Sequence, residues 1–201
     1  MNVTLKSALP RAVHQRKAHQ QGFTFLELVI VIVLLGILAA TAIPRFLNAT
    51  DEAEIVALQG VAGGFGTATA MARAQWYAQG KPSTTINGAT RSSVDYDGKT
   101  IYLNENGWPA NTDPLEASRE NDQTTAACLQ LWQGLLQSAP PITSNRERRI
   151  KSQYFVEVID SNPDICRYEL VVNNAPDARP THYFDYELDD GNITVILPSR
   201  K

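Results

Sequence analysis

The sequence predicts an α+β protein in which one long N-terminal helix precedes an antiparallel sheet. Three observations carry this prediction: an apolar run of transmembrane length near the N-terminus, a helical repeat of apolar residues directly after it, and strand-like segments that all follow this repeat. In an α/β fold strands and helices would alternate, whereas helix first and sheet afterwards is the order of an α+β fold.

Length, composition and charge limit the classes of protein that fit. The chain has 201 residues, enough for one ordinary domain with an appendage, and is 43% hydrophobic and 19% charged with two cysteines. The net charge is −3, but residues 1–22 hold four basic residues and no acid, so the remainder is strongly acidic. A net-acidic body argues against general nucleic-acid binding, because phosphate contacts require cations.

The apolar run extends from Phe23 to Ile43 and is interrupted only by two threonines and Glu27. At about 1.5 Å per residue, a helix of this length spans roughly the 30 Å of a bilayer hydrocarbon core. The basic segment before it stays in the cytoplasm by the positive-inside rule. The sequence therefore predicts a single-pass membrane helix with the rest of the chain exported.

A secretory signal peptide is the alternative explanation of this charge pattern. Its apolar core would be Leu28–Leu38, and Ala40-Thr41-Ala42 would be its cleavage site. That alternative leaves Glu27 unexplained, because a charged residue deep in a membrane helix costs about 2.5–3.5 kcal/mol on insertion scales. Such a residue therefore indicates a functional role by default. The simpler alternative is that the Glu27 carboxylate lies in the headgroup region.

The segment Gly22–Glu27, followed by the apolar run, closely resembles the processing site of type IV prepilins and type II secretion pseudopilins. The resemblance covers residues 22 to about 47 and includes Pro44, where family members often carry a helix-bending proline. It implies the pilin fold, with a long helix that is embedded in the inner membrane by its first half and packed on a sheet by its second. It also implies a prepilin peptidase that cuts after Gly22 on the cytoplasmic side and methylates the new amine of Phe23.

The physical consequence of such a cut concerns Glu27. Cleavage places a positive amine on Phe23, four residues before the carboxylate. In a filament core that excludes water, an unpaired carboxylate is costly, and the amine of a neighbouring subunit can neutralise it. At about 4 Å and an effective dielectric constant near 20, the gross attraction is roughly 4 kcal/mol before desolvation. We therefore expect Glu27 to set the assembly register, in the same core segment as Pro44.

The predicted organisation has four parts. They are a basic leader that is removed (1–22), a transmembrane or filament-core helix (23–43), an amphipathic half of the same helix (44–80) and a globular head (81–201). In the amphipathic half, apolar residues recur at steps of three and four, and the helix ends near Gln79, before a Gly-Lys-Pro stop. The repeat comprises Leu58, Val61, Phe65, Ala68, Ala72 and Trp76. Glycines within it (Gly60, Gly63, Gly64 and Gly66) permit either close packing of strands or local melting.

The head is expected to contain a hairpin, a second helix and a four-stranded meander. Asp97-Gly98 predicts the hairpin turn, and Thr125–Gln137 predicts the helix. The strands of the meander are predicted over Gln153–Ile159, Ile165–Val172, His182–Leu188 and Asn192–Leu197, with Asp190-Gly191 as the last tight turn.

Cys128 and Cys166 both lie on the side of the membrane predicted to be exported, where an oxidising compartment favours a disulfide. The loop-entropy account gives about 4 kcal/mol for a ring of this size. Related pilins often carry such a bridge. Two free thiols are the alternative.

Nothing in the sequence indicates catalysis, a cofactor or a metal site. The part after the leader has one histidine, His182, and no Gly-rich loop follows a strand. Asp189-Asp190-Gly191 could suggest calcium, but a turn explains it. The basic cluster is Arg146, Arg148, Arg149 and Lys151, and because Glu147 lies among them a solvated loop is favoured over a filament or DNA contact.

The resemblance thus implies a structural subunit whose partners are the prepilin peptidase/methyltransferase, other pilin subunits and the inner membrane. After assembly it would lie in a surface pilus (fimbrium) with a role in pilus biogenesis or adhesion. Short segments resemble pilins of the mannose-sensitive haemagglutinin (MSHA) group, and one of them favours a minor (MshB-like) member. These are Leu58–Val61, Arg73–Trp76, Asn106–Pro109 and Cys128 with Trp132. A type II secretion pseudopilin is the first alternative, and a secreted or signal-anchored enzyme is the alternative from another class.

Overall fold

The computed structural model describes residues 22–116, 119, 121–172 and 180–197. The predicted leader therefore lies outside the described residues, apart from Gly22. The chain divides into two compact units, Met1–Phe46 and Leu47–Lys201, and a single helix, α1 (Phe25–Ala78), contributes to both.

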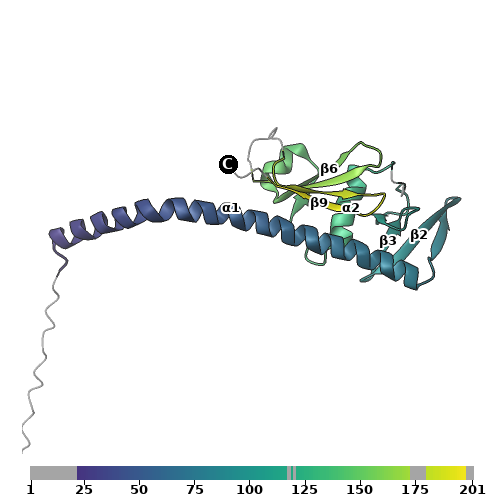
Figure 1. Cartoon of the computed structure of the whole chain (residues 1–201), viewed down its shortest axis with the longest axis horizontal. Coiled ribbons are helices and arrows are strands. Elements are labelled where there is room, and N and C mark those ends of the chain that lie inside the picture. The colour runs from purple at the N-terminus through teal and green to yellow at the C-terminus, as the bar shows by residue number, and fades with distance from the viewer. Residues whose placement is uncertain (1–21, 117–118, 120, 173–179, 198–201) are drawn as a thin grey trace, which may run out of the picture. The chain divides into compact units, whose positions relative to one another are not determined.

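Strands in two sheets and a second helix follow α1 (Figure 1). Their bounds are β1 Ser83–Ile86, β2 Ala89–Tyr96, β3 Lys99–Leu103, β4 Pro109–Asn111, α2 Thr125–Leu135, β5 Ile142–Thr143, the 3-10 helix η1 Arg146–Lys151, β6 Tyr154–Ile159, β7 Ile165–Leu170, β8 Tyr183–Glu187 and β9 Ile193–Ile196. The first sheet has the order β1-β2-β3-β4 and is antiparallel throughout. The second has the order β5-β6-β7-β8-β9, and only the β5–β6 pair is parallel. The α+β prediction is confirmed.

The first half of α1 exposes its apolar side chains. None of the residues from Phe25 to Ile43 is buried, and the segment is long and apolar enough to cross a membrane. The sequence predicted that the helix starts at Phe23, but it starts at Phe25, because Thr24 forms its N-terminal cap.

The second half of α1 supplies one side of a hydrophobic core. Its buried residues follow the predicted spacing, except that Ala62 and Thr69 are also buried and Val61 is only half-buried. Phe65 is fully buried, and its ring centroid lies 5.1 to 6.5 Å from the rings of Trp132, Tyr168, Phe184 and Tyr186. This aromatic cluster joins α1, α2 and the second sheet into one core.

Glycine marks the closest approach of a strand to α1. A Cβ added at Gly66 would lie 3.2 Å from Cγ1 of Ile193 on β9, whereas one added at Gly60 or Gly63 would meet nothing within 4 Å. Of the two explanations offered for these glycines, close strand packing therefore applies at Gly66. The helix ends one residue before the predicted position, where Gly80 (φ 79°) and Lys81 (φ 60°) adopt left-handed conformations.

Among its described residues, the head contains three strands that the sequence did not predict, namely β1, β4 and β5. β1 pairs with β2 across Asn87-Gly88, a two-residue turn of the same kind as the predicted Asp97-Gly98 turn. β4 and β5 have three and two residues, too short to produce a repeat that a sequence pattern can detect. The second helix and the four strands of the meander occupy their predicted places to within two residues at each end.

Candidate processing and assembly site

The candidate site is the start of α1, where Gly22, Phe23 and Thr24 precede the first helical residue. Gly22 is exposed, and a Cβ placed on it would meet nothing within 4 Å. The Phe23 side chain is 78% exposed. The backbone between Gly22 and Phe23 is thus an accessible, non-helical peptide, the form of backbone that a peptidase can bind.

Thr24 and Glu27 form a reciprocal helix cap. The Glu27 Oε2 atom accepts hydrogen bonds from the Thr24 backbone N–H and from Thr24 Oγ1, both at 2.9 Å. In return, the Glu27 N–H donates to Thr24 Oγ1 at 3.2 Å. This is the capping-box arrangement, in which two otherwise unsatisfied N–H groups of the first turn gain partners. The carboxylate therefore has a local partner, and its charge lies at the positive end of the helix dipole.

Glu27 is the one acidic residue in the apolar first part of α1, Phe25–Ile43. All residues from Phe25 to Ile43 are exposed except Val29, which is half-buried. Because the described residues bury none of this surface, it fits a bilayer or apolar helices of other chains. Pro44 lies within the continuous backbone of α1.

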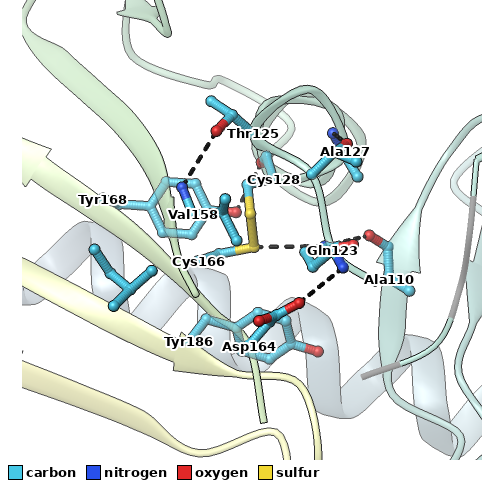
Figure 2. Close-up of a disulfide and its surroundings, with 12 residues drawn as sticks. Ala110, Gln123, Thr125, Ala127, Cys128, Val158, Asp164, Cys166, Tyr168 and Tyr186 are labelled. Atoms are coloured by element: carbon cyan, nitrogen blue, oxygen red, sulfur yellow. Dashed lines mark hydrogen bonds between the residues drawn. A yellow bond between two sulfur atoms is a disulfide. The ribbon is translucent and has the colours of Figure 1, made fainter. Parts of the chain in front are cut away.

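The cysteine pair lies in the other unit. Cys128 on α2 and Cys166 on β7 form a disulfide with a Cα–Cα distance of 5.5 Å, and both residues are fully buried (Figure 2). The Tyr168 hydroxyl donates a hydrogen bond to the Cys128 carbonyl oxygen at 2.8 Å. Burial raises the pKa of this phenol well above its usual value. The bridge thus ties α2 to the centre of the second sheet.

Two of the short motifs named in the sequence analysis, residues 73–76 and 106–109, contact one another. The Arg73 guanidinium lies 4.2 Å from the centroid of the Trp108 ring and donates to the Asn106 carbonyl oxygen at 3.2 Å. Gly107 has a φ of 81°, and a Cβ there would lie 2.6 Å from Cζ3 of Trp76. Sequence reasoning named both motifs but did not pair them, because nothing in one sequence links residues 73–76 with 106–109.

The basic cluster is only partly a solvated loop, which corrects the prediction. Arg149 is 3% exposed and forms a forked ion pair with Glu169, which is also buried. Arg146 pairs with Glu157 at 2.8 Å. Because acidic partners on β6 and β7 lie far away in the sequence, the local pattern of charges could not reveal that two of the four cations are used within the chain.

The Asp189–Gly191 segment forms the β8–β9 turn, in which Asp190 Oδ1 accepts from the Asn192 N–H at 2.8 Å. His182 is half-buried, and its Nδ1 lies 2.9 Å from Thr181 Oγ1. Across the described residues, no group of three His, Cys, Asp or Glu side chains is placed to hold a metal ion.

Comparison with known proteins places this geometry in context. Residues 17–43 match the family model described as the prokaryotic N-terminal methylation motif. The chain is 31% identical over 116 residues to a fimbrial protein of Neisseria meningitidis (56% of this chain, 65% of the relative). It is 44% identical over 63 residues to the type IV narrow pilus major component of Thermus thermophilus (31% and 53%). It is 38% identical over 45 residues to the type II secretion system core protein G of Pseudomonas aeruginosa (22% and 32%).

The chain spans less than two thirds of the length of each of these relatives. No solved structure matches it. The fold and the start of α1 define a protein with a methylation-motif helix and an α+β head. More particularly, the motif and the relatives support the type IV pilin family in the wide sense that includes pseudopilins.

Proposed function

We propose that the chain is a type IV pilin-like structural subunit that is cleaved after Gly22, N-methylated at Phe23 and assembled into a filament through α1. The observation that carries the proposal is the combination of a methylation motif with an apolar helical segment, Phe25–Ile43, none of which is buried. Such a surface needs a partner outside the chain. The first partner is the inner membrane, and the later partners are the helices of other subunits.

Glu27 changes partners in this proposal. In the precursor its carboxylate accepts from Thr24, and cleavage then adds a positive amine at Phe23, one residue before the cap. While the subunit remains in the bilayer, Glu27 can stay near the interface or pair with its own amine. In the filament, pairing with a neighbour's amine fixes the axial register, because only one offset between helices brings the two charges together.

Membrane orientation follows from the same segment. The prepilin peptidase/methyltransferase acts at the cytoplasmic face, where the basic leader is held, and the head is periplasmic. The head reaches the cell surface when the subunit joins a pilus. The role is structural, in pilus biogenesis and adhesion, and no catalytic residue is assigned.

Within the family we favour a pilus subunit, and specifically a minor pilin of the MSHA type. Its support is the resemblance of residues 73–76 and 106–109 to that group. A type II secretion pseudopilin is the second candidate, and the similarity to core protein G of Pseudomonas aeruginosa favours it. Deleting the gene separates the two, because loss of surface filaments indicates a pilin and loss of exoprotein secretion indicates a pseudopilin.

Processing is tested by mass spectrometry of the membrane-extracted protein. We expect a mature N-terminus at N-methylated Phe23, and uncut precursor for Gly22→Leu, since the new side chain enters a site shaped for glycine. Gly36→Leu is the matched control, because a Cβ at Gly36 also meets nothing within 4 Å and this variant should be cut normally. A protein that starts at Ile43, or one that retains its leader, would contradict the proposal.

A further inference from the structure

The Cys128–Cys166 disulfide lies inside the folded unit rather than on its surface. Both cysteines have 0% exposure, and they belong to elements that are distant in sequence, with a separation of 38 residues. Disulfides form and break when a thiolate attacks a sulfur atom through a mixed disulfide, so the attacking group must reach the sulfur. In the folded unit neither an oxidant nor a reductant can do so.

One side of the bridge is covered by the segment that leads into α2. Gln123 Nε2 lies 3.5 Å from Cys166 Sγ and donates to the Ala110 carbonyl oxygen at 2.7 Å. The Gln123 backbone N–H donates to Asp164 Oδ2 at 3.0 Å, and the residue is only 7% exposed (Figure 2). This segment is therefore fastened to β4 and to the start of β7 directly beside the sulfur.

The other side is covered by α2 itself. At the start of the helix, Thr125 Oγ1 accepts from the Val158 N–H on β6 at 3.3 Å. Beyond Cys128, the Trp132 ring stacks on Tyr168 of β7 with centroids 5.2 Å apart. Uncovering either sulfur therefore requires α2 to leave the sheet and the aromatic core to open.

We propose that the bridge is made by thiol–disulfide exchange before α2 docks on β7, and that docking then places it out of reach of thiols. The oxidant is a disulfide-bearing molecule of the oxidising compartment into which the head is exported. The thiolate of one cysteine attacks it, which forms a mixed disulfide and releases one oxidant thiol. The second cysteine then attacks the protein sulfur, forms the Cys128–Cys166 bond and releases the other. Two protein thiols are oxidised, one oxidant disulfide is reduced, and both protons end on the oxidant's thiols.

The inference goes beyond the proposed function, because it holds for a pilin and for a pseudopilin alike. It requires only that the second unit meets an oxidising compartment while α2 is still free. Formation of the filament is a later event in this order, because the subunit that enters it already has a closed core.

Reduction of the full-length protein in detergent tests the enclosure. The variant Ser83→Cys, on the exposed strand β1, is capped with glutathione so that one chain holds an exposed and a buried disulfide. We expect dithiothreitol to remove the cap at least about a thousandfold faster than it opens the bridge. In urea below the unfolding midpoint, opening should accelerate in parallel with the unfolded fraction. Comparable rates, or a bridge that opens at a rate independent of urea, would overturn the proposal.

Oxidative refolding tests the order of events. Reduced, unfolded chain is transferred to native buffer, and oxidised glutathione is added after increasing delays. If the reduced chain folds, the rate of bridge formation should fall as the delay increases, because docking of α2 covers the thiols. If the reduced chain does not fold, α2 docks only after oxidation. Both results support the proposed order. The contrary result is a reduced chain with native near-ultraviolet circular dichroism that is oxidised as fast as the unfolded chain.

Discussion

The two halves of α1 are both apolar, but they differ in where their partners lie. From Phe25 to Ile43 no residue is buried, and apolar residues occupy all sides of the helix. From Leu58 to Trp76 the buried residues follow a helical repeat, because their partners are the sheets and α2. A single stripe thus indicates a partner within the chain, whereas an unbroken apolar surface indicates one outside it.

The sharpest test of this contrast is a pair of truncations, Phe65→Ala and Ile32→Ala. Phe65 contacts four aromatic rings in the closed core, so its truncation should cost about 5 kcal/mol of unfolding free energy, near the upper end for buried phenylalanine. Ile32 is 57% exposed, so its truncation should leave the denaturation of the head unchanged. Urea titration of both variants in detergent measures the difference, and equal losses would remove the distinction between the halves.

Much of this contrast could be predicted from the sequence, because it depends on local patterns. The long helix, the second helix and the four-stranded meander follow from apolar periodicity and from Gly and Pro punctuation. The short strands β4 and β5 did not, since three and two residues are too few to show an alternating pattern of apolar residues.

The candidate site shows the same limit. Glu27 stands out in the sequence as a charge in an apolar run, and Thr24 with Glu27 also fits the T-x-x-E capping pattern, a signal that was present and not used. By contrast, the Arg149–Glu169 pair and the contact between Arg73 and Trp108 join residues with no local relation. Such pairs are set by the tertiary fold. The roles of Gly22, Phe23, Glu27 and Pro44 stay predictions.

A charge change in the exposed half should act on assembly rather than on folding. Glu27→Gln should permit insertion and cleavage, with insertion eased by up to a few kcal/mol. In the filament the same change leaves a neighbour's amine without its counter-charge, which costs about 3–5 kcal/mol by analogy with broken buried pairs. The measurement is the variant's share in sheared filaments relative to its level in the membrane.

The control for that experiment is Glu54→Gln, an exposed glutamate in the second half of α1. It should enter filaments at the wild-type share, because its carboxylate is expected to remain in water. Wild-type incorporation of Glu27→Gln would mean that the carboxylate does not set the register, and its only remaining role would be the cap with Thr24.

A charge change in the closed unit should act on stability instead. Arg149→Met leaves Glu169 buried without its forked partner, which should cost about 3 kcal/mol. The double variant Arg149→Met/Glu169→Met should recover most of that loss, since replacing both ions by apolar groups is often close to neutral. Thermal denaturation of the three proteins tests this, and a double variant as unstable as the single one would show that the pair contributes more than charge compensation.

The smallest effect is expected from single methyl groups on two glycines of the second half of α1. Within a helix, Gly→Ala is favourable by up to about 1 kcal/mol. At Gly63 a Cβ meets nothing within 4 Å, so Gly63→Ala should raise the unfolding free energy by about that amount. At Gly66 the Cβ would lie 3.2 Å from Ile193, so Gly66→Ala should gain less or lose stability. Ile193→Ala removes the opposing Cγ1 atom. If β9 sets the cost, Gly66→Ala should be more favourable in the Ile193→Ala background than in the wild type, whereas Gly63→Ala should have the same effect in both. Equal responses of the two glycines in urea titrations would mean that β9 places no steric demand on the helix.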